Sequence, residues 1–226
     1  MINMAFGFLN QAVSLGVNHL KRVVSNAILP GEKRENTSEG DLYAHLSKHA
    51  YNMNNDEVDK EILKHGYKVD RELSNKNAKV YSNTKTGDAV IGYRGTDPSN
   101  IEDLAADLHI ASGSRSHKRF REAEDLAKST MNKYKGKKVR VTGHSLGGTQ
   151  ALHVNDKLGL EASVYNPGAS AVGNEKPIKN KNVKVTRHAG DLVSGGLKAG
   201  NEKRVTLHGN RSSLGLYDVL KNHSIF

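Results

Sequence analysis

The chain of 226 residues contains no cysteine. This absence excludes disulfide bonds, thiolate-bound zinc, iron–sulfur clusters and a cysteine nucleophile, and it fits a reducing compartment without assigning one. Aromatic residues make up only 5% of the chain. No stretch interleaves basic residues with stacking aromatic residues, so nucleic acid is not favoured as a partner.

Acidic residues are outnumbered, 24 against 34 lysines and arginines, which gives a formal net charge of +10. A basic surface favours anionic partners such as phospholipid headgroups. The lysines are spread from Lys21 to Lys221 instead of forming one block, and a well-charged soluble surface accounts for most of them. The composition carries no signal of oligomeric state.

The chain also lacks a long hydrophobic run, and its most apolar part is residues 1–30, where no charge precedes Lys21. Polar residues interrupt this segment too often for a secretory signal or a membrane span. Its apolar residues recur at steps of three and four, which predicts an amphipathic helix: Phe6, Leu9, Val13, Val17, Leu20 and Val24. We expect it to lie on a membrane surface through residues 1–29, with docking on its own domain as the open alternative. Residues 31–40 are predicted to be a linker.

Residues 41–226 are predicted to form one α/β domain. The predicted helices cover residues 41–52, 55–65, 100–110, 117–135 and 146–158. The predicted strands cover residues 78–82, 89–94, 138–143, 162–165, 183–188 and 204–207. Because strands alternate with helices, we expect a mainly parallel central sheet covered by helices on both faces.

One short motif carries the strongest chemical signal. A β-branched strand runs into residues 143–148, with the sequence GHSLGG, and a helical pattern follows. In the strand, G-x-S-x-G, helix arrangement, the serine stands on a sharp turn that exposes its Oγ at the end of the sheet. Glycines two residues before and after the serine prevent collisions between strand and helix. The context therefore predicts Ser145 as a nucleophile.

At this point the chain resembles the class 3, fungal lipase-like family of the α/β-hydrolase fold. Besides the serine motif, three segments resemble the family in its usual order: residues 90–96 (VIGYRGT), 101–108 (IEDLAADL) and 165–168 (YNPG), the last followed by Gly173-Asn174. The first forty residues lie outside the resemblance. It implies an α/β-hydrolase fold and a serine carboxylic-ester hydrolase that acts on lipid acyl esters, without a cofactor.

In hydrolases of this type, the order along the chain is serine, acid, histidine. Asp191 follows the predicted strand 183–188 and a small-residue loop, and its surroundings resemble the family's acid motif. His223 resembles the family's C-terminal histidine, and His208 is the alternative. The predicted catalytic triad is therefore Ser145, Asp191 and His223.

The oxyanion hole is predicted to consist of the backbone N–H groups of Leu146 and Thr96. The Thr96 hydroxyl is a candidate third donor. Residues 100–111 form either a lid over the site or an ordinary amphipathic surface helix. The substrate class implied by the resemblance is a triacylglycerol or a phospholipid. The basic charge and the apolar N-terminal helix favour its presentation at an anionic lipid surface.

Other histidines and other functions are alternatives to this interpretation. His45 and His49 are four residues apart on a predicted helix, but no third ligand accompanies them, so no metal site is predicted. His144 is expected to support the serine turn, with its side chain directed away from Ser145. The alternative functions are an acyltransferase or thioesterase with the same triad, and a non-catalytic membrane-associated protein that retains the hydrolase fold.

Overall fold

The computed structural model describes only part of the chain. The described residues are 33–34, 41–52, 55–96, 115–169, 177–188, 191, 194 and 205–208. The predicted helix over residues 1–30, the segment 100–111 and His223 lie outside them. Within the predicted linker 31–40, Lys33 and Arg34 form the short strand β1 (Lys33–Arg34), which pairs with the edge of the sheet.

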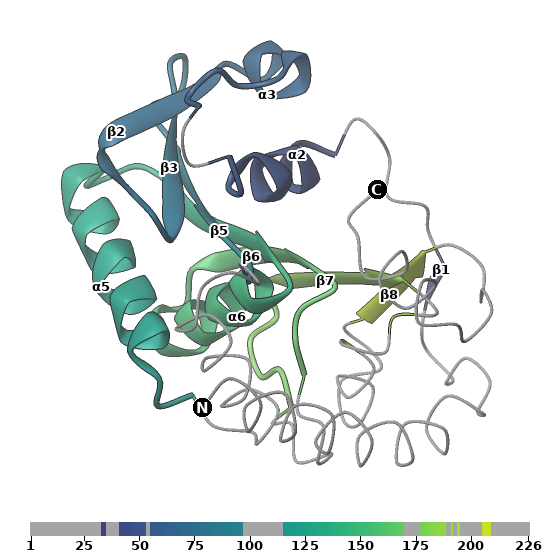
Figure 1. Ribbon diagram of the computed structural model, residues 1–226. Helices are drawn as coiled ribbons and strands as arrows, with labels where there is room; N and C mark the ends of the chain where they lie inside the picture. Colours follow the sequence, from purple (N-terminus) through teal and green to yellow (C-terminus); the bar gives the residue numbers. More distant parts are fainter. Residues whose placement is uncertain are drawn as a thin grey trace, which may run out of the picture.

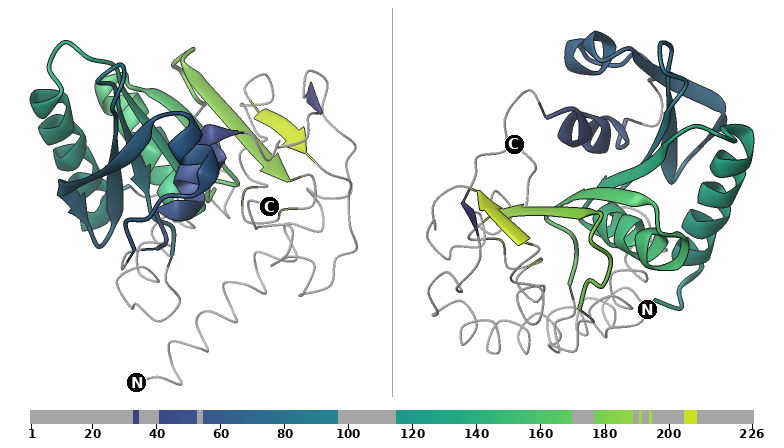
Figure 2. Two further views of the ribbon diagram at one scale, coloured as in Figure 1. Left: turned by 90° about the horizontal axis from the view of Figure 1, so that it is seen from above. Right: turned by 180° about the vertical axis from the view of Figure 1, so that it is seen from behind.

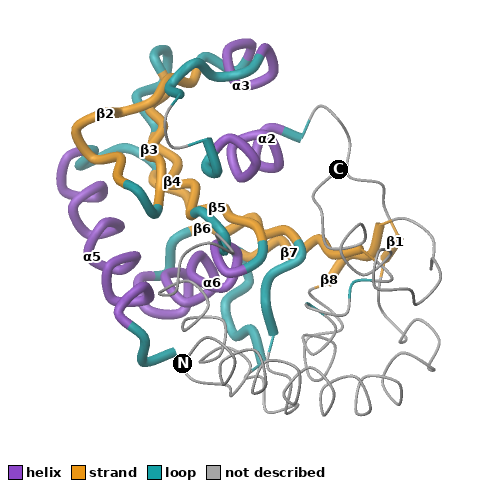
Figure 3. The backbone as a smooth tube through the Cα atoms, in the orientation of Figure 1, coloured by secondary structure: helices purple, strands orange, loops and turns teal. Residues whose placement is uncertain are grey.

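A single eight-stranded sheet organises the domain, in the order β1-β8-β7-β6-β5-β4-β3-β2 (Figures 1 and 3). The remaining strands are β2 (Tyr67–Asn75), β3 (Ala78–Asn83), β4 (Ala89–Tyr93), β5 (Val139–His144), β6 (Glu161–Tyr165), β7 (Val183–His188) and β8 (Val205–His208). Every neighbouring pair from β4 to β8 is parallel, and so is β8 with β1, whereas β2–β3 and β3–β4 are antiparallel. The prediction of a mainly parallel α/β sheet is confirmed.

Helices cover both faces of this sheet, as the views in Figures 1 and 2 show. One face carries α5 (Lys118–Lys133) and α6 (Leu146–Leu158), and the other carries α2 (Leu42–His49) and α3 (Lys60–Lys64). Successive side chains of β4 point to opposite faces of the sheet, so this strand packs against both helical layers. Ile91 belongs to the cluster under α5 and α6, whereas its neighbour Val90 packs with Leu46 of α2.

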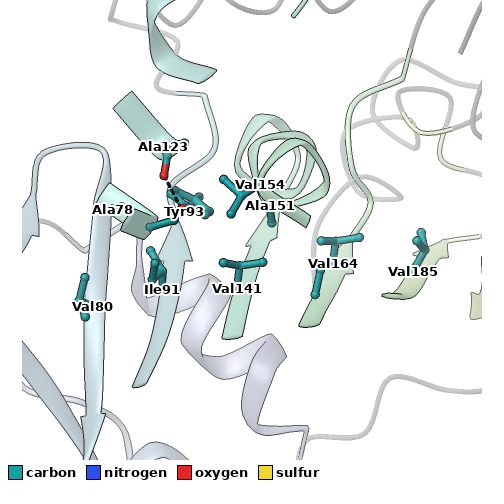
Figure 4. Packing of buried hydrophobic residues seen from close by; sticks show 12 residues of the cluster. Ala78, Val80, Ile91, Tyr93, Ala123, Val141, Ala151, Val154, Val164 and Val185 are labelled. Atoms are coloured by element: carbon teal, nitrogen blue, oxygen red, sulfur yellow. Dashed lines mark hydrogen bonds between the residues drawn. The ribbon is translucent and has the colours of Figure 1, made fainter. Parts of the chain in front are cut away.

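The larger hydrophobic cluster lies between the sheet and the α5–α6 layer (Figure 4). Ile91 pairs with Val141 across β4 and β5, and Val164 pairs with Val185 across β6 and β7. All four are 0–1% exposed. The hydroxyl of Tyr93 donates to the carbonyl oxygen of Ala123 at 2.8 Å, which ties the end of β4 to α5. The end of β4 is thereby anchored within the core.

Besides β1, two elements differ from the predictions. The helix predicted over residues 55–65 is limited to α3, because the Asp59 carboxylate accepts from the Ile62 N–H and so caps the helix at that point. Before the cap, residues 55 and 56 accept hydrogen bonds from the buried ammonium of Lys79. Strand β2 was not predicted. It lies at the edge of the sheet and carries charged residues such as Lys68, Arg71 and Glu72, so it lacks the apolar run used to recognise strands.

Candidate active site

Ser145 lies at the junction of β5 and α6, at the carboxyl ends of the parallel strands. Its backbone has φ 56° and ψ −128°, a conformation that a residue with a side chain adopts only when the surroundings enforce it. Here, the Ser145 N–H donates to the Tyr165 carbonyl at 3.2 Å, and the Ser145 carbonyl accepts from the N–H groups of Thr149 and Gly168. These bonds hold the turn on which the predicted nucleophile stands.

The two glycines of the motif are required by close backbone contacts. A Cβ atom on Gly147 would lie 2.0 Å from the carbonyl oxygen of Tyr93, and one on Gly143 would lie 2.4 Å from the carbonyl carbon of Gly147. Neither space can hold a methyl group, because both obstacles are backbone atoms. The start of α6 is therefore pressed directly against the end of β4.

This contact brings the two predicted oxyanion residues toward one another. Tyr93 and Gly143 are partners in the parallel ladder between β4 and β5, and Thr96 and Leu146 each lie three residues beyond their paired residue. Leu146 is the first residue of α6 and is 1% exposed. Its N–H belongs to the first turn of the helix, where N–H groups lack partners within the helix.

Asp191 lies at the same edge of the sheet, three residues beyond β7. It is 2% exposed. Its carboxylate accepts a hydrogen bond of 2.5 Å from the hydroxyl of Ser194, and its N–H donates to the His188 carbonyl at 3.0 Å. Burial and, to a smaller extent, Arg187 lower the pKa of His188, although the nearby Asp191 opposes that shift. A buried aspartate whose carboxylate and backbone are each held by a hydrogen bond suits the acid of a triad.

The predicted general base is not placed by the described residues. His208 ends β8, where its backbone pairs with His188 of β7. His223 lies outside the described residues. The structure thus brings Ser145 and Asp191 to the carboxyl ends of β5 and β7, and the choice between His223 and His208 stays a prediction.

Several residues of the site were not singled out from the sequence. Asn166 has a positive φ of 40°, and its side-chain oxygen accepts a 2.6 Å hydrogen bond from the N–H of His188, which links the ends of β6 and β7. The Y-N-P-G segment drew attention to this position but not to this role. Ser194 carried no signal, since isolated serines near an acid are common.

His144 behaves as a neighbour of the serine turn that faces α2. It is 8% exposed, and its Nδ1 shares a 2.8 Å hydrogen bond with the hydroxyl of Tyr51, which follows α2. His45 and His49 have separate partners: His45 bonds Asp59, whereas His49 bonds the Tyr81 hydroxyl and the Glu57 carbonyl. Among the described residues, no group of three or more acidic or histidine side chains is arranged to hold a metal ion.

A cavity of about 230 Å³ lies at the same edge of the sheet as the serine turn. Its floor includes Ala78, Tyr93 and Ala123, and Arg119 and Gln150 contribute polar groups. Arg119 is 1% exposed and donates to the Arg94 carbonyl at 3.0 Å, so it joins α5 to the residue that follows β4.

Among the helices that the structure describes, none has the length and apolar character needed to cross a bilayer.

A sequence model of the family described as a Tle-like phospholipase domain matches residues 42–193. The search of curated proteins finds no match.

Solved structures similar to this chain include several fungal lipases. The Rhizomucor miehei lipase–propeptide complex is 20% identical, with a TM-score of 0.44, and the match covers 69% of this chain and 61% of that one. Lipase II from Rhizopus niveus is 18% identical, with a TM-score of 0.46 and coverage of 69% and 72%. A lipase from Yarrowia lipolytica is 16% identical, with a TM-score of 0.44 and coverage of 70% and 72%. The chain thus spans about three fifths of the first of these proteins.

Proposed function

We propose, from the premise that this chain belongs to the family of Tle-like phospholipase domains, that Ser145 is its nucleophile. The family match spans residues 42–193, and the chain is accordingly an ester hydrolase of the lipase and phospholipase type. One observation supports the assignment of Ser145 above all others. Its backbone, at φ 56° and ψ −128°, is held in a rare conformation where β5 turns into α6, which is the arrangement that presents a serine hydroxyl at the end of a sheet.

The proposed reaction begins when His223 takes the proton from Oγ of Ser145 as this oxygen attacks the ester carbonyl carbon. Asp191 holds the imidazole in the required tautomer and stabilises its positive charge. The tetrahedral intermediate collapses, and the departing alcohol takes the proton from the imidazolium. Water then hydrolyses the acyl-enzyme by the same steps in reverse. His208 is the alternative base, since it follows Asp191 along the chain as well.

In this proposal, the N–H groups of Leu146 and Thr96 donate hydrogen bonds to the carbonyl oxygen and stabilise the negative charge that develops on it. Two features support this assignment. Leu146 opens α6, so its N–H belongs to the positive end of a 13-residue helix. Gly147 abuts the Tyr93 carbonyl, which keeps the end of β4 in contact with the start of that helix. The Thr96 hydroxyl is the candidate third donor.

Among lipid esters, we propose a phospholipid as the substrate and an acyl ester as the bond that is cleaved. The family's description names a phospholipase. The net charge of +10 favours approach to anionic lipid surfaces. Residues 1–29, outside the described part of the chain, are the segment we expect to lie on such a surface.

The nucleophile is tested with a fluorophosphonate probe, which reacts with activated serines. The native protein should be labelled, and Ser145→Ala should abolish labelling while the melting temperature stays within a few degrees of the native value. Ser163→Ala is a matched control, since Ser163 is a half-buried serine within β6. Equal labelling of the native protein and Ser145→Ala would exclude Ser145.

The substrate is tested with vesicles of phosphatidylglycerol, vesicles of phosphatidylcholine and emulsified triacylglycerol. Free fatty acid should be released fastest from the anionic phospholipid, and the difference between the vesicles should shrink in high salt, because salt screens surface charge. A higher rate on triacylglycerol than on either phospholipid would contradict the proposed substrate class.

A further inference from the structure

We propose that Tyr51 is a positioning residue for the oxyanion hole, because its hydroxyl sets the spacing between the end of β4 and the serine turn. The inference rests on the proposed function of Ser145, Thr96 and Leu146. We place Tyr51 outside the groups that touch the substrate. It acts through the two residues beside the reacting groups, Gly95 and His144.

The hydroxyl of Tyr51 occupies the narrow space between these two residues. It lies 2.8 Å from Nδ1 of His144 and 3.5 Å from the carbonyl oxygen of His144. A Cβ atom on Gly95 would be 1.9 Å from this hydroxyl and 2.9 Å from the same carbonyl oxygen. The phenol thus touches the residue before Thr96 and the residue before Ser145 at once.

Helix α2, which ends two residues before Tyr51, packs against the same two strands. The Ser47 hydroxyl and the Thr142 hydroxyl share a hydrogen bond of 2.6 Å, which joins α2 to β5. On β4, a Cβ atom on Gly92 would lie 3.2 Å from the Leu46 carbonyl oxygen, so α2 packs closely on that strand as well. Tyr51 therefore follows a helix that is held on both strands, and the contacts of its hydroxyl place it at the carboxyl end of β5.

The spacing matters because oxyanion donors act only when they point at the position that the oxyanion will occupy. The two proposed donors belong to different segments: Thr96 follows β4, and Leu146 opens α6. Strand pairing fixes these segments only as far as Tyr93 and His144. Where this pairing ends, the Tyr51 hydroxyl meets both segments: it hydrogen-bonds His144, the last residue of β5, and it lies against Gly95, two residues beyond β4.

The test compares Tyr51→Phe with Tyr134→Phe. Both variants remove one hydroxyl and its hydrogen bond, but the Tyr134 hydroxyl bonds Asp70 at 2.6 Å, at the antiparallel edge of the sheet. The measurements are kcat and KM for a soluble p-nitrophenyl ester, the rate of fluorophosphonate labelling and the melting temperature. Loss of a whole oxyanion donor costs about 10²–10³-fold in rate, so a displaced donor should cost less.

We expect Tyr51→Phe to lower kcat and the labelling rate by about 10-fold, with KM within twofold of native. Tyr134→Phe should lower the melting temperature at least as much and leave both rates unchanged. In addition, the ¹⁵N shifts of the His144 imidazole should change in Tyr51→Phe, which reports the lost hydrogen bond directly.

Three results would overturn the inference. If both rates of Tyr51→Phe match native values, the hydroxyl sets no catalytic spacing. If the two variants lose activity only in proportion to their loss of folded protein, Tyr51 has a merely structural role. If the native protein is neither active nor labelled, the proposed function is wrong, and the role of Tyr51 is rejected with it. If the native protein and Tyr51→Phe are labelled at equal rates, only the role of Tyr51 is rejected.

Discussion

The serine turn and the antiparallel edge of the sheet are held together in opposite ways. At the serine turn, backbone meets backbone: Gly147 is pressed against the Tyr93 carbonyl, with no room for a methyl group. At the edge formed by β2 and β3, charged side chains make the connections. The carboxylate of Asp70 accepts hydrogen bonds from Lys133 and Tyr134, and the buried ammonium of Lys79 bonds Asp56.

The difference indicates which part can adjust. Side chains can change rotamer, exchange partners or titrate, so a charge network loses stability in small steps. A backbone contact too close to admit a Cβ atom has no such freedom, since relief requires that a strand or a helix moves as a unit. The proposed catalytic geometry, which would tolerate displacements of well under 1 Å, thus lies where the fold is least adjustable.

The strongest test of this comparison is Gly147→Ala. The added Cβ would lie 2.0 Å from the Tyr93 oxygen, so α6 must separate from β4. We expect a loss of about 3 kcal/mol or more in the free energy of unfolding, measured with urea, and no fluorophosphonate labelling.

Gly136→Ala is the control for that variant. Gly136 has φ +78°, and no atom lies within 4 Å of the position of an added Cβ. The variant should therefore lose only the cost of placing alanine in the left-handed conformation, about 1–2 kcal/mol in the free energy of unfolding. Fluorophosphonate labelling should not change. Equal losses in the two variants would mean that the close contact at Gly147 is not what limits this region.

The serine turn is also the part of the molecule that the sequence predicts best. Helix α6 runs over the predicted residues 146–158, and β5 ends within one residue of its predicted end. The reason is that a local motif sets the local geometry here: the glycines and the β-branched strand stand within ten residues of one another. The resemblance to lipases, inferred from such motifs, is confirmed by the family match over residues 42–193.

Features that depend on distant parts of the chain were harder to predict. Strand β2 is stabilised by pairing with β3 and by a contact with α5, in which Asp70 accepts a hydrogen bond from Lys133. These two residues are 63 positions apart in the sequence. The role of Tyr51 depends on His144, 93 residues away. No local pattern encodes such a pair, so it becomes visible only when the strands are assembled.

Asp70→Asn tests the antiparallel edge, with a smaller expected effect. Burial would raise the pKa of the Asp70 carboxyl, but hydrogen bonds from Lys133 and Tyr134 outweigh it and lower the pKa overall. The variant keeps the shape and removes the charge, so we expect a loss of about 2 kcal/mol in the free energy of unfolding. Labelling of the folded protein should not change.

Glu72→Gln is the matched control at this edge. Its carboxylate bonds the same Lys133 ammonium at 2.6 Å, but its side chain is 78% exposed. An exposed ion pair contributes little, so the loss should stay below about 0.5 kcal/mol. If Asp70→Asn were equally mild, the edge would not depend on its buried carboxylate, and the contrast with the serine turn would need another explanation.

The smallest expected effect concerns pH. His49 is 9% exposed, and its ring bonds the Tyr81 hydroxyl and the Glu57 carbonyl. Burial lowers the pKa of His49, and Lys79 lowers it further. The unfolded chain therefore binds a proton more readily than the folded protein. The resulting stability is fully present above the unfolded pKa of about 6.5 and is lost as the pH falls toward the lower folded pKa.

His49→Gln should reduce this acid sensitivity. The free energy of unfolding of the native protein is expected to fall between pH 7 and 5.5, by at most about 1.4 kcal/mol per pH unit from this one proton. In the variant the slope should be shallower but not zero, because burial also lowers the pKa of His153 and His188. The pKa values of Asp56, Asp59 and Asp70 are lowered as well, but these carboxyl groups change the free energy of unfolding only below about pH 4. They therefore do not contribute to the slope between pH 7 and 5.5. Identical slopes for the two proteins would show that His49 titrates alike in the folded and unfolded chains, and that the α2 layer is less closed to water than its contacts imply.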